Sequence, residues 1–264
     1  MKKNPFALDG RMALVAGACG EIGRRLCGAL AANGADLIVS DLRADACVTL
    51  TQELTSSYSG RYVPAPGDCS SEEGIRAIMN ACDSAGSIHI VIHCIGLIGS
   101  APIPGYAVSL EKQTLEAWEK AIRVNLTSAF LLATHVYPRL DQSGKASLIF
   151  LSSIYGSLGP DWSLYEKTAM GNPLAYGASK GGLQQLMRYL ATRWAPQVRV
   201  NCVSPGGLQR DQEEIFIRRY EQRTPMRRMA TPDDIVGPVL FLASDAACYV
   251  TGQNLLVDGG WSAW

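Results

Sequence analysis

Residues 12–23 read MALVAGACGEIG, an apolar run that passes directly into a glycine-rich turn. The run 12–16 is typical of a buried strand, and the spacing of apolar residues over 22–33 predicts a helix. Glycines at such a turn let the backbone approach a pyrophosphate, and the helix N-terminus supplies free N–H groups and the positive end of a dipole. The stretch therefore predicts a dinucleotide-binding turn, although a lone glycine-rich loop also fits an ordinary strand–helix connection.

Strand-like and helix-like segments alternate along the rest of the chain. Further strands are expected at 35–40, 62–65, 88–93, 146–151, 198–203 and 254–257, and further helices at 44–57, 72–84, 115–137, 174–194, 213–222 and 232–243. Strands that are continuous apolar runs are buried on both faces, and their alternation with helices predicts an α/β fold with a doubly wound parallel sheet of the Rossmann type. We expect about seven strands, with helices on both faces. Without a repeat or linker, residues 1–264 are expected to form a single domain.

Asp41 stands at the end of the second expected strand, 18 residues after Gly23. A carboxylate there accepts hydrogen bonds from the adenosine ribose hydroxyls and repels a 2′-phosphate. The glycine-rich turn and the acid together favour NAD over NADP. The alternative is that Asp41 only caps the end of its strand.

Tyr176 and Lys180 lie four residues apart in the segment expected to form the helix 174–194. Residues at this spacing share one helix face. A nearby ammonium lowers the pKa of a tyrosine hydroxyl, which can then exchange the proton that accompanies hydride transfer. A solvated helix face would give the same spacing. Three nearby tyrosines, Tyr155, Tyr165 and Tyr189, have no lysine four residues later.

Composition excludes several other classes. The chain has 24 basic and 24 acidic side chains, so no nucleic acid and no anionic membrane surface is expected as a partner. No apolar run is long enough for a membrane span or follows Met1–Phe6 as in a signal peptide, which predicts a cytoplasmic protein. The eight cysteines contain no Cys-x-x-Cys pair and the three histidines are scattered, so no metal site is expected and the thiols should be reduced and mostly buried.

From about Leu8 to Trp261, the chain resembles the short-chain dehydrogenases/reductases, because their motifs follow one another in family order. These are the glycine-rich turn 17–23, Asp41, Asp68, Gly96, Asn125, Ser152-Ser153, Tyr176 with Lys180, Asn201-Cys-Val-Ser-Pro205-Gly206, Thr251-Gly252-Gln253-Asn254 and Asp258-Gly259-Gly260. The resemblance implies an NAD-dependent oxidoreductase that works as a homo-oligomer, either a tetramer or a dimer.

The resemblance also implies roles for individual residues. Ser153 would hold the substrate oxygen, Tyr176 would exchange the proton, and Lys180 would depress the tyrosine pKa and bind the nicotinamide ribose. Asn125 would bend its helix and hold a water in the proton relay. The implied cofactor residues are Gly17, Cys19, Gly20, Glu21, Ile22, Gly23, Asp41, Leu42, Asp68, Cys69, Cys94, Gly96, Tyr176, Lys180, Pro205, Gly206 and Leu208. Asp68 would face the adenine, and Pro205 and Gly206 would border the nicotinamide.

Several residues depart from the family pattern. Glu21 takes the place of the middle glycine, a spacing that looks like the branch acting on nucleotide sugars. His93-Cys94-Ile95-Gly96 replaces the usual Asn-Asn-Ala-Gly, which puts side-chain support of that strand in doubt. The threonine that often follows Pro-Gly is absent from 207–210, so the nicotinamide amide would need backbone partners.

The segment 152–173 is the first of two expected substrate loops, and it is about ten residues longer than usual. It resembles a subgroup associated with bacterial surface-sugar and flagellin-glycan biosynthesis. Its tyrosines and tryptophan predict an ordered segment that walls the substrate pocket. The implied substrate residues are Ser153, Tyr155, Tyr165 and Tyr176, with Tyr165 the foremost contact. The alternative is that the segment packs on a neighbouring subunit.

The second expected substrate loop, 204–228, carries six arginines within 207–228, at 210, 218, 219, 223, 227 and 228. They are expected mainly on a solvated face, and a minority interpretation is contact with an anionic group of the substrate. The apolar C-terminal stretch, with Trp261 and Trp264, would be exposed in a monomer, which adds to the expectation of a homo-oligomer.

The sequence thus predicts an NAD(H)-dependent oxidoreductase that transfers a hydride between nicotinamide and an alcohol or carbonyl, on a sugar or another polyhydroxylated small molecule. One alternative is an epimerase or dehydratase that uses tightly bound NAD transiently. The other is a non-catalytic protein that senses NAD by binding it. The presence of Asn125, Ser153, Tyr176 and Lys180 speaks against the sensor, which needs no acid/base relay.

Overall fold

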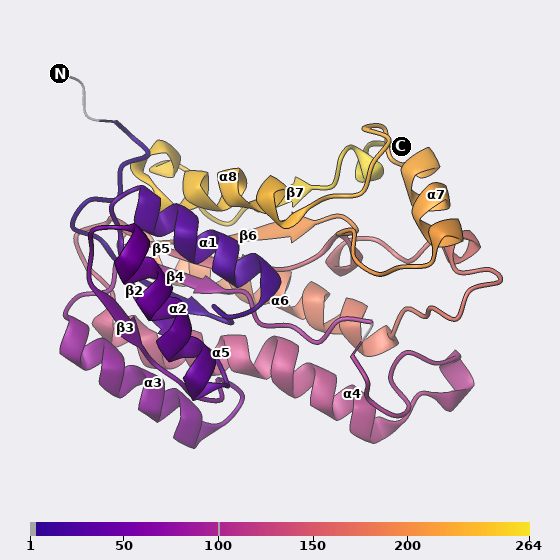
Figure 1. The fold of residues 1–264 in the computed structure, drawn as a ribbon, viewed down its shortest axis with the longest axis horizontal. Helices are drawn as coiled ribbons and strands as arrows, with labels where there is room; N and C mark the ends of the chain where they lie inside the picture. The colour runs from indigo at the N-terminus through magenta and orange to yellow at the C-terminus, as the bar shows by residue number, and fades with distance from the viewer. Residues whose placement is uncertain (1–3, 100) are drawn as a thin grey trace.

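The computed structural model describes residues 4–99 and 101–264, so Met1, Lys2 and Lys3 of the N-terminal segment considered above lie outside it. Its centre is a seven-stranded sheet in which every neighbouring pair is parallel, in the order β3-β2-β1-β4-β5-β6-β7. The predicted doubly wound α/β fold is therefore confirmed (Figure 1).

Most element boundaries follow the apolar pattern of the sequence. The strands are β1 (Met12–Ala16), β2 (Asp36–Ser40), β3 (Tyr62–Pro64), β4 (Ile90–His93), β5 (Ala146–Leu151), β6 (Val198–Pro205) and β7 (Asn254–Val257). The helices are α1 (Glu21–Ala32), α2 (Ala44–Ser57), α3 (Glu72–Ala85), α4 (Leu115–Ile122), α5 (Ser128–Val136), α6 (Leu174–Trp194), α7 (Glu214–Arg223) and α8 (Pro232–Ala243).

Helices cover both faces of the sheet, as Figure 1 shows for α1 and α8 on one side and α3 and α5 on the other. Leu26 of α1 and Ile235 of α8 belong to one buried apolar cluster, and Leu132 of α5 and Leu183 of α6 belong to the other. The strands between them are fully buried, because each is covered by helices on both sides.

The helix expected over 115–137 is divided in two. A single π-helical turn, Arg123–Thr127, separates α4 from α5. Periodicity cannot locate such an insertion, because one wider turn shifts the phase of the apolar stripe without ending it. Inserted π turns are frequent at functional sites, and this one contains Asn125.

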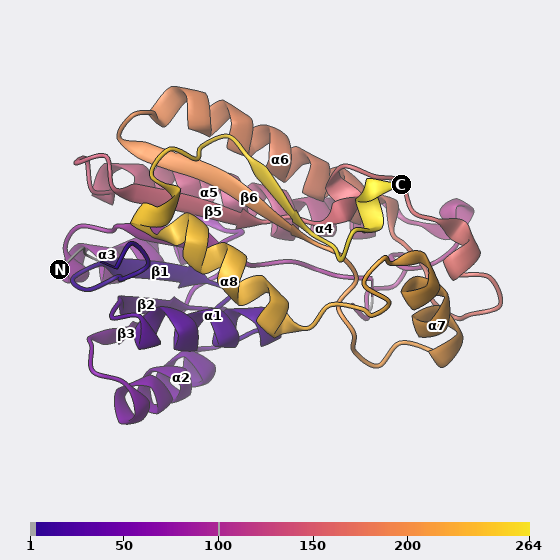
Figure 2. The same cartoon turned by 90° about the horizontal axis from the view of Figure 1, so that it is seen from above.

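The connections after β5 and β6 extend beyond the carboxyl end of the sheet, where α7 projects from the main body (Figure 2). Ligands of open α/β folds bind at this end of the sheet. Both expected substrate loops therefore leave the sheet on the side where a ligand would lie.

All eight cysteines are free. Cys27, Cys47, Cys69, Cys82 and Cys202 are buried, Cys19 and Cys94 are half-buried, and Cys248 is exposed. Burial raises the pKa of several of these thiols, that of Cys202 to about 12. Within the described residues, no helix is long and apolar enough to cross a bilayer.

Candidate active site

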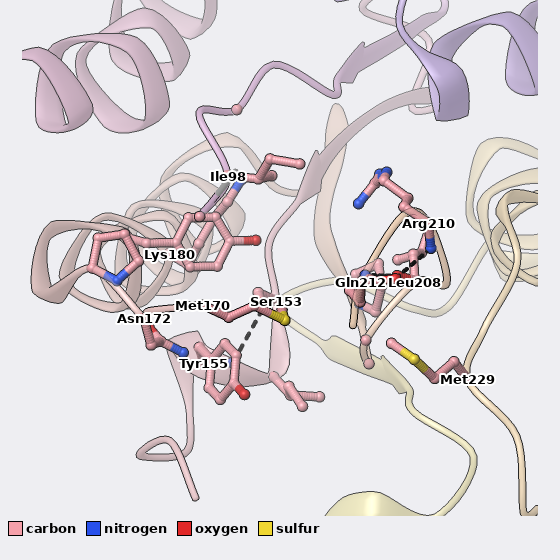
Figure 3. Close-up of a pocket in the computed structure, with 18 of the residues that line it drawn as sticks. Ile98, Ser153, Tyr155, Met170, Asn172, Lys180, Leu208, Arg210, Gln212 and Met229 are labelled. Atoms are coloured by element: carbon pink, nitrogen blue, oxygen red, sulfur yellow. Dashed lines mark hydrogen bonds between the residues drawn. The ribbon is translucent and has the colours of Figure 1, made fainter. Parts of the chain in front are cut away.

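A cavity of about 650 Å³ opens at the carboxyl ends of the strands. One end is lined by the glycine-rich turn after β1, and the other by the segments that follow β5 and β6. Figure 3 shows Tyr155 and Asn172 on one side of this space and Leu208, Arg210 and Met229 on the other. The cavity brings together Ser153, Tyr176 and Lys180, three of the four residues expected to carry the chemistry, whereas Asn125 is absent from its lining.

Lys180 is held in place by the end of β5. Its Nζ donates to the carbonyl of Leu151 at 2.8 Å and lies 5.7 Å from the centre of the Tyr176 ring. The residue is only 4% exposed, and burial lowers the pKa of Lys180 to about 8. Gly96 leaves close room beside it, because a Cβ at this position would stand 3.2 Å from the lysine Nζ, and the amine would have to shift slightly.

Tyr176 occupies the first turn of α6, half-buried against Ser153. Burial raises the pKa of the Tyr176 hydroxyl, while hydrogen bonding with Ser153 and the positive charge of Arg210 oppose that rise. The sequence led us to expect a Tyr176 pKa depressed by Lys180. In the structure the net direction is upward, so that expectation is wrong, because desolvation of the phenolate dominates.

Asn125 is fully buried within the π turn and clamps the loop after β4. Its Oδ1 accepts from Leu97 N at 2.6 Å, and its Nδ2 donates to Ser179 Oγ at 3.0 Å. These contacts join α6 to the segment after Gly96, so Asn125 fixes the wall behind Lys180.

His93 supports the same turn from the sheet. Its Nε2 lies 2.8 Å from Ser128 Oγ, and that hydroxyl donates to the carbonyl of Val124 at 2.5 Å. Because the Ser128 proton is used on Val124, the histidine must be the donor, which makes it the Nε2–H tautomer and leaves Nδ1 without a partner in the described chain. Burial lowers the His93 pKa to about 3, so the ring is neutral.

The glycine-rich turn is shaped for close backbone approach. A Cβ at Gly23 would lie 2.1 Å from the Gly17 carbonyl oxygen, and Gly17 has a φ of +83°. Gly17, Gly20, Glu21, Ile22 and Gly23 all line the cavity. They leave room at the N-terminus of α1, where an anionic group of a cofactor is favoured.

The residues expected near the adenosine lie beyond this cavity. Its lining includes Cys94, Gly96, Pro205, Gly206 and Leu208 but not Cys19, Asp41, Leu42, Asp68 or Cys69. Asp41 accepts from Cys19 N at 3.0 Å and from Leu42 N at 2.8 Å, so it also acts as the cap considered above. Asp68 accepts from both the backbone N–H and the hydroxyl of Ser70.

A row of aromatic residues forms the far end of the cavity. The Tyr155 and Tyr165 hydroxyls are 3.0 Å apart, and Asn172 Nδ2 donates to Tyr165 at 3.1 Å. Tyr165 packs on Phe216 of α7, and Phe216 packs on Tyr220. The segment 152–173 is thus ordered and lines the cavity, with Tyr165 at its edge.

The structure adds residues that the sequence analysis missed. Lining residues without a prior assignment include Ile98, Met170, Asn172, Phe216, Tyr220 and Met229. No short motif marks them, since they come from separate segments, the loop after β4, the segment 152–173, α7 and the stretch that follows it, and converge only in the folded chain. Trp261 is also buried, because it stacks on Tyr220 with ring centres 4.4 Å apart, so the expectation that it would be exposed in a monomer is wrong. The same expectation holds for Trp264, which is 69% exposed.

The six arginines of 207–228 have different surroundings. Only Arg210 lines the cavity, where its Nε contacts Glu21 Oε2 at 2.7 Å. Arg223 pairs with Asp161 at 2.9 Å, and Arg219 donates to the carbonyl of Leu164. The others contact Glu214 (Arg218), the Gln222 carbonyl (Arg227) and Asp234 (Arg228). Most of the run therefore braces α7 and its flanks.

Within residues 4–99 and 101–264, no cluster of three or more His, Cys, Asp or Glu side chains could hold a metal ion. The cavity lining offers hydroxyls, an amine, a guanidinium, carboxylates, amides and the Cys94 thiol.

The chain is similar along nearly its whole length to known reductases and dehydrogenases. A family model described as enoyl-(acyl carrier protein) reductase matches residues 17–262. A galactitol 2-dehydrogenase (L-tagatose-forming) of Cereibacter sphaeroides is 33% identical over 98% of both chains. The post-translational flagellin modification protein A of Campylobacter coli is 30% identical over 96% of this chain and 99% of its own. A gluconate 5-dehydrogenase from Burkholderia cenocepacia J2315, solved with NADP and tartrate, superimposes with a TM-score of 0.87 at 26% identity over 98% of both chains.

Proposed function

Because the chain belongs to the short-chain dehydrogenase/reductase family of oxidoreductases, we propose that it transfers a hydride between NAD(H) and an alcohol or carbonyl carbon of a sugar or another polyhydroxylated small molecule. The observation that carries this proposal is one continuous cavity with Ser153, Tyr176 and Lys180 between a glycine-rich turn and a hydroxyl-bearing aromatic end. The galactitol dehydrogenase and the gluconate dehydrogenase among the similar proteins support a sugar-like substrate.

The side chains of the cavity fit proton exchange at a substrate oxygen. When bound, the nicotinamide supplies or accepts the hydride. Ser153 then holds the substrate oxygen by a hydrogen bond, next to the Tyr176 hydroxyl. In carbonyl reduction the neutral phenol of Tyr176 donates its proton to that oxygen, and in alcohol oxidation the phenolate accepts it.

Lys180 and Asn125 complete this machinery from behind Tyr176. A lysine with a pKa of about 8 can exchange a proton near neutral pH, so Lys180 can pass the proton to or from the tyrosine. We also assign to Lys180 the binding of the nicotinamide ribose. Asn125 fixes the loop after β4 and, by this proposal, borders the water that continues the relay.

The room left at Gly17, Gly20 and Gly23 fits a dinucleotide pyrophosphate, and Asp41 at the end of β2 fits an unphosphorylated ribose. We therefore assign NAD rather than NADP, with Cys19, Leu42, Asp68 and Cys69 around the adenosine. The similar gluconate dehydrogenase was solved with NADP, so the two cofactors must be compared directly.

Titration with NADH and NADPH tests the cofactor. The wild-type protein should bind NADH more tightly than NADPH. Asp41→Ala should weaken NADH binding and narrow the difference between the two affinities. Asp45→Ala removes an exposed carboxylate from the first turn of α2 and is the matched control. It should change neither the NADH affinity nor the NADPH affinity. A wild-type protein that prefers NADPH would overturn the assignment.

A substrate screen tests the reaction. Sugars, polyols, aldonates, sugar phosphates and nucleotide sugars would be offered with NAD and with NADH, and the NADH absorbance followed. Net change with at least one of them supports the dehydrogenase. Product formation without net change would indicate the epimerase or dehydratase, and binding without product would indicate the sensor.

We further propose a cytoplasmic homotetramer in which residues 1–264 form one catalytic domain and 152–173 and 204–228 are substrate loops. Eight free thiols suit a reducing compartment. With Trp261 buried, the support for assembly moves to large apolar side chains left exposed on the neighbouring helices α4, α5 and α6, namely Leu115, Trp118, Phe130, Leu174 and Tyr189. A monomer in sedimentation at micromolar concentration would overturn the tetramer.

A further inference from the structure

An ion pair joins the two loops at the mouth of the cavity. Glu21 is the first residue of α1, directly after the N-cap Gly20, and Arg210 belongs to the loop after β6. Arg210 Nε lies 2.7 Å from Glu21 Oε2, and both side chains line the cavity and remain partly exposed. The contact therefore connects the glycine-rich turn with the loop across from it.

The position of Glu21 is unfavourable for a protein that binds a dinucleotide there. The N-terminus of α1 attracts the pyrophosphate through free N–H groups and the helix dipole. A carboxylate on the first helical residue stands beside that anion and repels it. A cation placed between the two negative groups would remove this conflict, and Arg210 is the basic side chain that contacts Glu21 in the described structure.

Arg210 has hydrogen-bond donors left to bind an anion. Only its Nε is engaged by a carboxylate, and neither terminal guanidinium nitrogen has a hydrogen-bond partner within residues 4–99 and 101–264. A guanidinium binds phosphate oxygens with two parallel N–H donors. Figure 3 shows the Arg210 side chain extending from its loop beside the cavity rather than packing onto Leu208 or Gln212.

The loop that carries Arg210 is built to present it. Gln212 accepts the Arg210 backbone N–H at 2.5 Å and donates to the Leu208 carbonyl at 2.7 Å, which closes a compact turn. Gln209 N donates to the Ala230 carbonyl at 2.9 Å, which ties the turn to the segment before α8. The backbone of Arg210 is thus fixed, while its long side chain is free to change partner.

We infer that Arg210 is a ligand of the cofactor pyrophosphate, and that Glu21 holds its guanidinium at the site until the pyrophosphate competes for it. The inference rests on the proposed dinucleotide function and assigns a side chain where the sequence suggested only backbone partners. Glu21 is the occupant that the phosphate must displace or share. Its carboxylate oxygen already accepts from the Arg210 Nε, as a phosphate oxygen would.

The inference predicts opposite signs for the two partners. Arg210→Gln should weaken the binding of NADH and of ADP-ribose by about tenfold, because one charge-assisted hydrogen bond is lost. Glu21→Gln should tighten both by about two- to fivefold, because it removes the competing carboxylate and keeps the shape. The affinities of Arg210→Lys should lie between those of wild type and Arg210→Gln. Calorimetric titration measures all of these without turnover.

Two controls separate the pyrophosphate from other contacts. Adenosine, which lacks the pyrophosphate, should bind all variants equally as a competitor of ADP-ribose. Arg218→Gln removes an arginine that also pairs with a glutamate, Glu214, but on the outer face of α7 and outside the cavity lining, so its affinities should match wild type. The Arg210→Gln variant should also lose part of the salt dependence of NADH binding.

Three results would overturn the inference. The first is equal ADP-ribose affinity in Arg210→Gln and wild type, including the case in which only a substrate KM rises, since Arg210 would then serve an anionic substrate. The second is a Glu21→Gln variant whose ADP-ribose affinity does not rise, because the pair would then only clasp the two loops. The third is equal weakening of adenosine by Arg210→Gln, which would indicate a distorted site. If wild type bound neither NADH nor ADP-ribose, the proposed function itself would fail.

Discussion

The two walls of the cavity are built in different ways. The inner wall is the end of β5 and the start of α6, residues 151–155 and 174–184, and its polar side chains bond to the backbone of the sheet and helix. Lys180 donates to the Leu151 carbonyl, and Ser152 Oγ donates to the Lys180 carbonyl at 3.0 Å. Residues of this wall are positioned by β5, which is buried along its whole length, and by α6, whose inner face packs in the core.

The outer wall, residues 160–173 and 207–229, is held by contacts between loops. Tyr165 packs on Phe216, Asp161 pairs with Arg223, and Glu213 accepts the backbone N–H of Ala169 at 2.7 Å. None of these contacts reaches the sheet. The outer wall meets the inner wall at the Tyr155–Tyr165 hydroxyl contact. Its residues that lie away from this contact can vary with less effect on the inner wall, which fits a fold that serves relatives named for different substrates.

Tyr176→Phe attacks the inner wall and should have the largest effect. Turnover should fall by about 10³- to 10⁴-fold, because the proton donor is lost, while NADH affinity stays nearly intact. Steady-state kinetics and cofactor titration measure the two quantities. Tyr189→Phe, an exposed position on the same helix, is the control. Substantial residual turnover in Tyr176→Phe would remove this residue from the mechanism.

Replacing residues 160–170 by a short Gly/Ser turn removes much of the outer wall. We expect kcat/KM to fall by about a hundredfold, because substrate orientation is lost, with cofactor affinity and oligomeric state preserved. Glu166→Gln, on the exposed side of the same segment, should be silent. An unchanged kcat/KM on the enzyme's own substrate would show that the segment has no role in the pocket. A changed oligomeric state would support its packing on a neighbouring subunit.

Ser153→Ala tests the inner wall through the pH dependence of the reaction. Alcohol oxidation needs the Tyr176 phenolate, so its rate should rise with pH toward the pKa of that hydroxyl. Hydrogen bonding with Ser153 lowers this pKa, so its removal should move the rise to higher pH and reduce kcat by about ten- to a hundredfold. Ser157→Ala is the control in the pH–rate profile. A profile that stays in place or moves to lower pH would contradict the assignment.

His93 and Ser128 give the smallest expected effect on turnover, a few-fold at most. Ser128→Ala leaves both His93 Nε2 and the Val124 carbonyl short of a partner, and should cost about 1–3 kcal/mol in the free energy of unfolding. His93→Leu removes a ring whose Nδ1 is already unpartnered, so its cost should be smaller. Urea denaturation of the two variants compares them, and the reverse order would contradict the view that the Ser128 hydroxyl is the more costly group to lose.

The sequence predicted the two walls unequally. The boundaries of α6 and β5 follow from apolar periodicity, because each element is buried by its own local pattern. Ser153, Tyr176 and Lys180 then fall at the end of the sheet by topology. The order of 152–173 could be anticipated from its aromatic residues, but Phe216 and Tyr220 meet it only through tertiary packing. For the same reason Trp261 was wrongly expected on the surface, since its partner Tyr220 lies far away in the chain.

The distribution of the thiols allows this enzyme to be labelled at one site. Cys248, in the turn that leads to β7, is exposed, whereas the other seven cysteines are buried or half-buried. A maleimide dye under mild conditions should therefore attach at this single place, since modification needs an accessible thiolate. Cys248 is absent from the cavity lining. A fluorophore there would give a site-specific reporter for diffusion, immobilisation or energy-transfer measurements without any engineered residue.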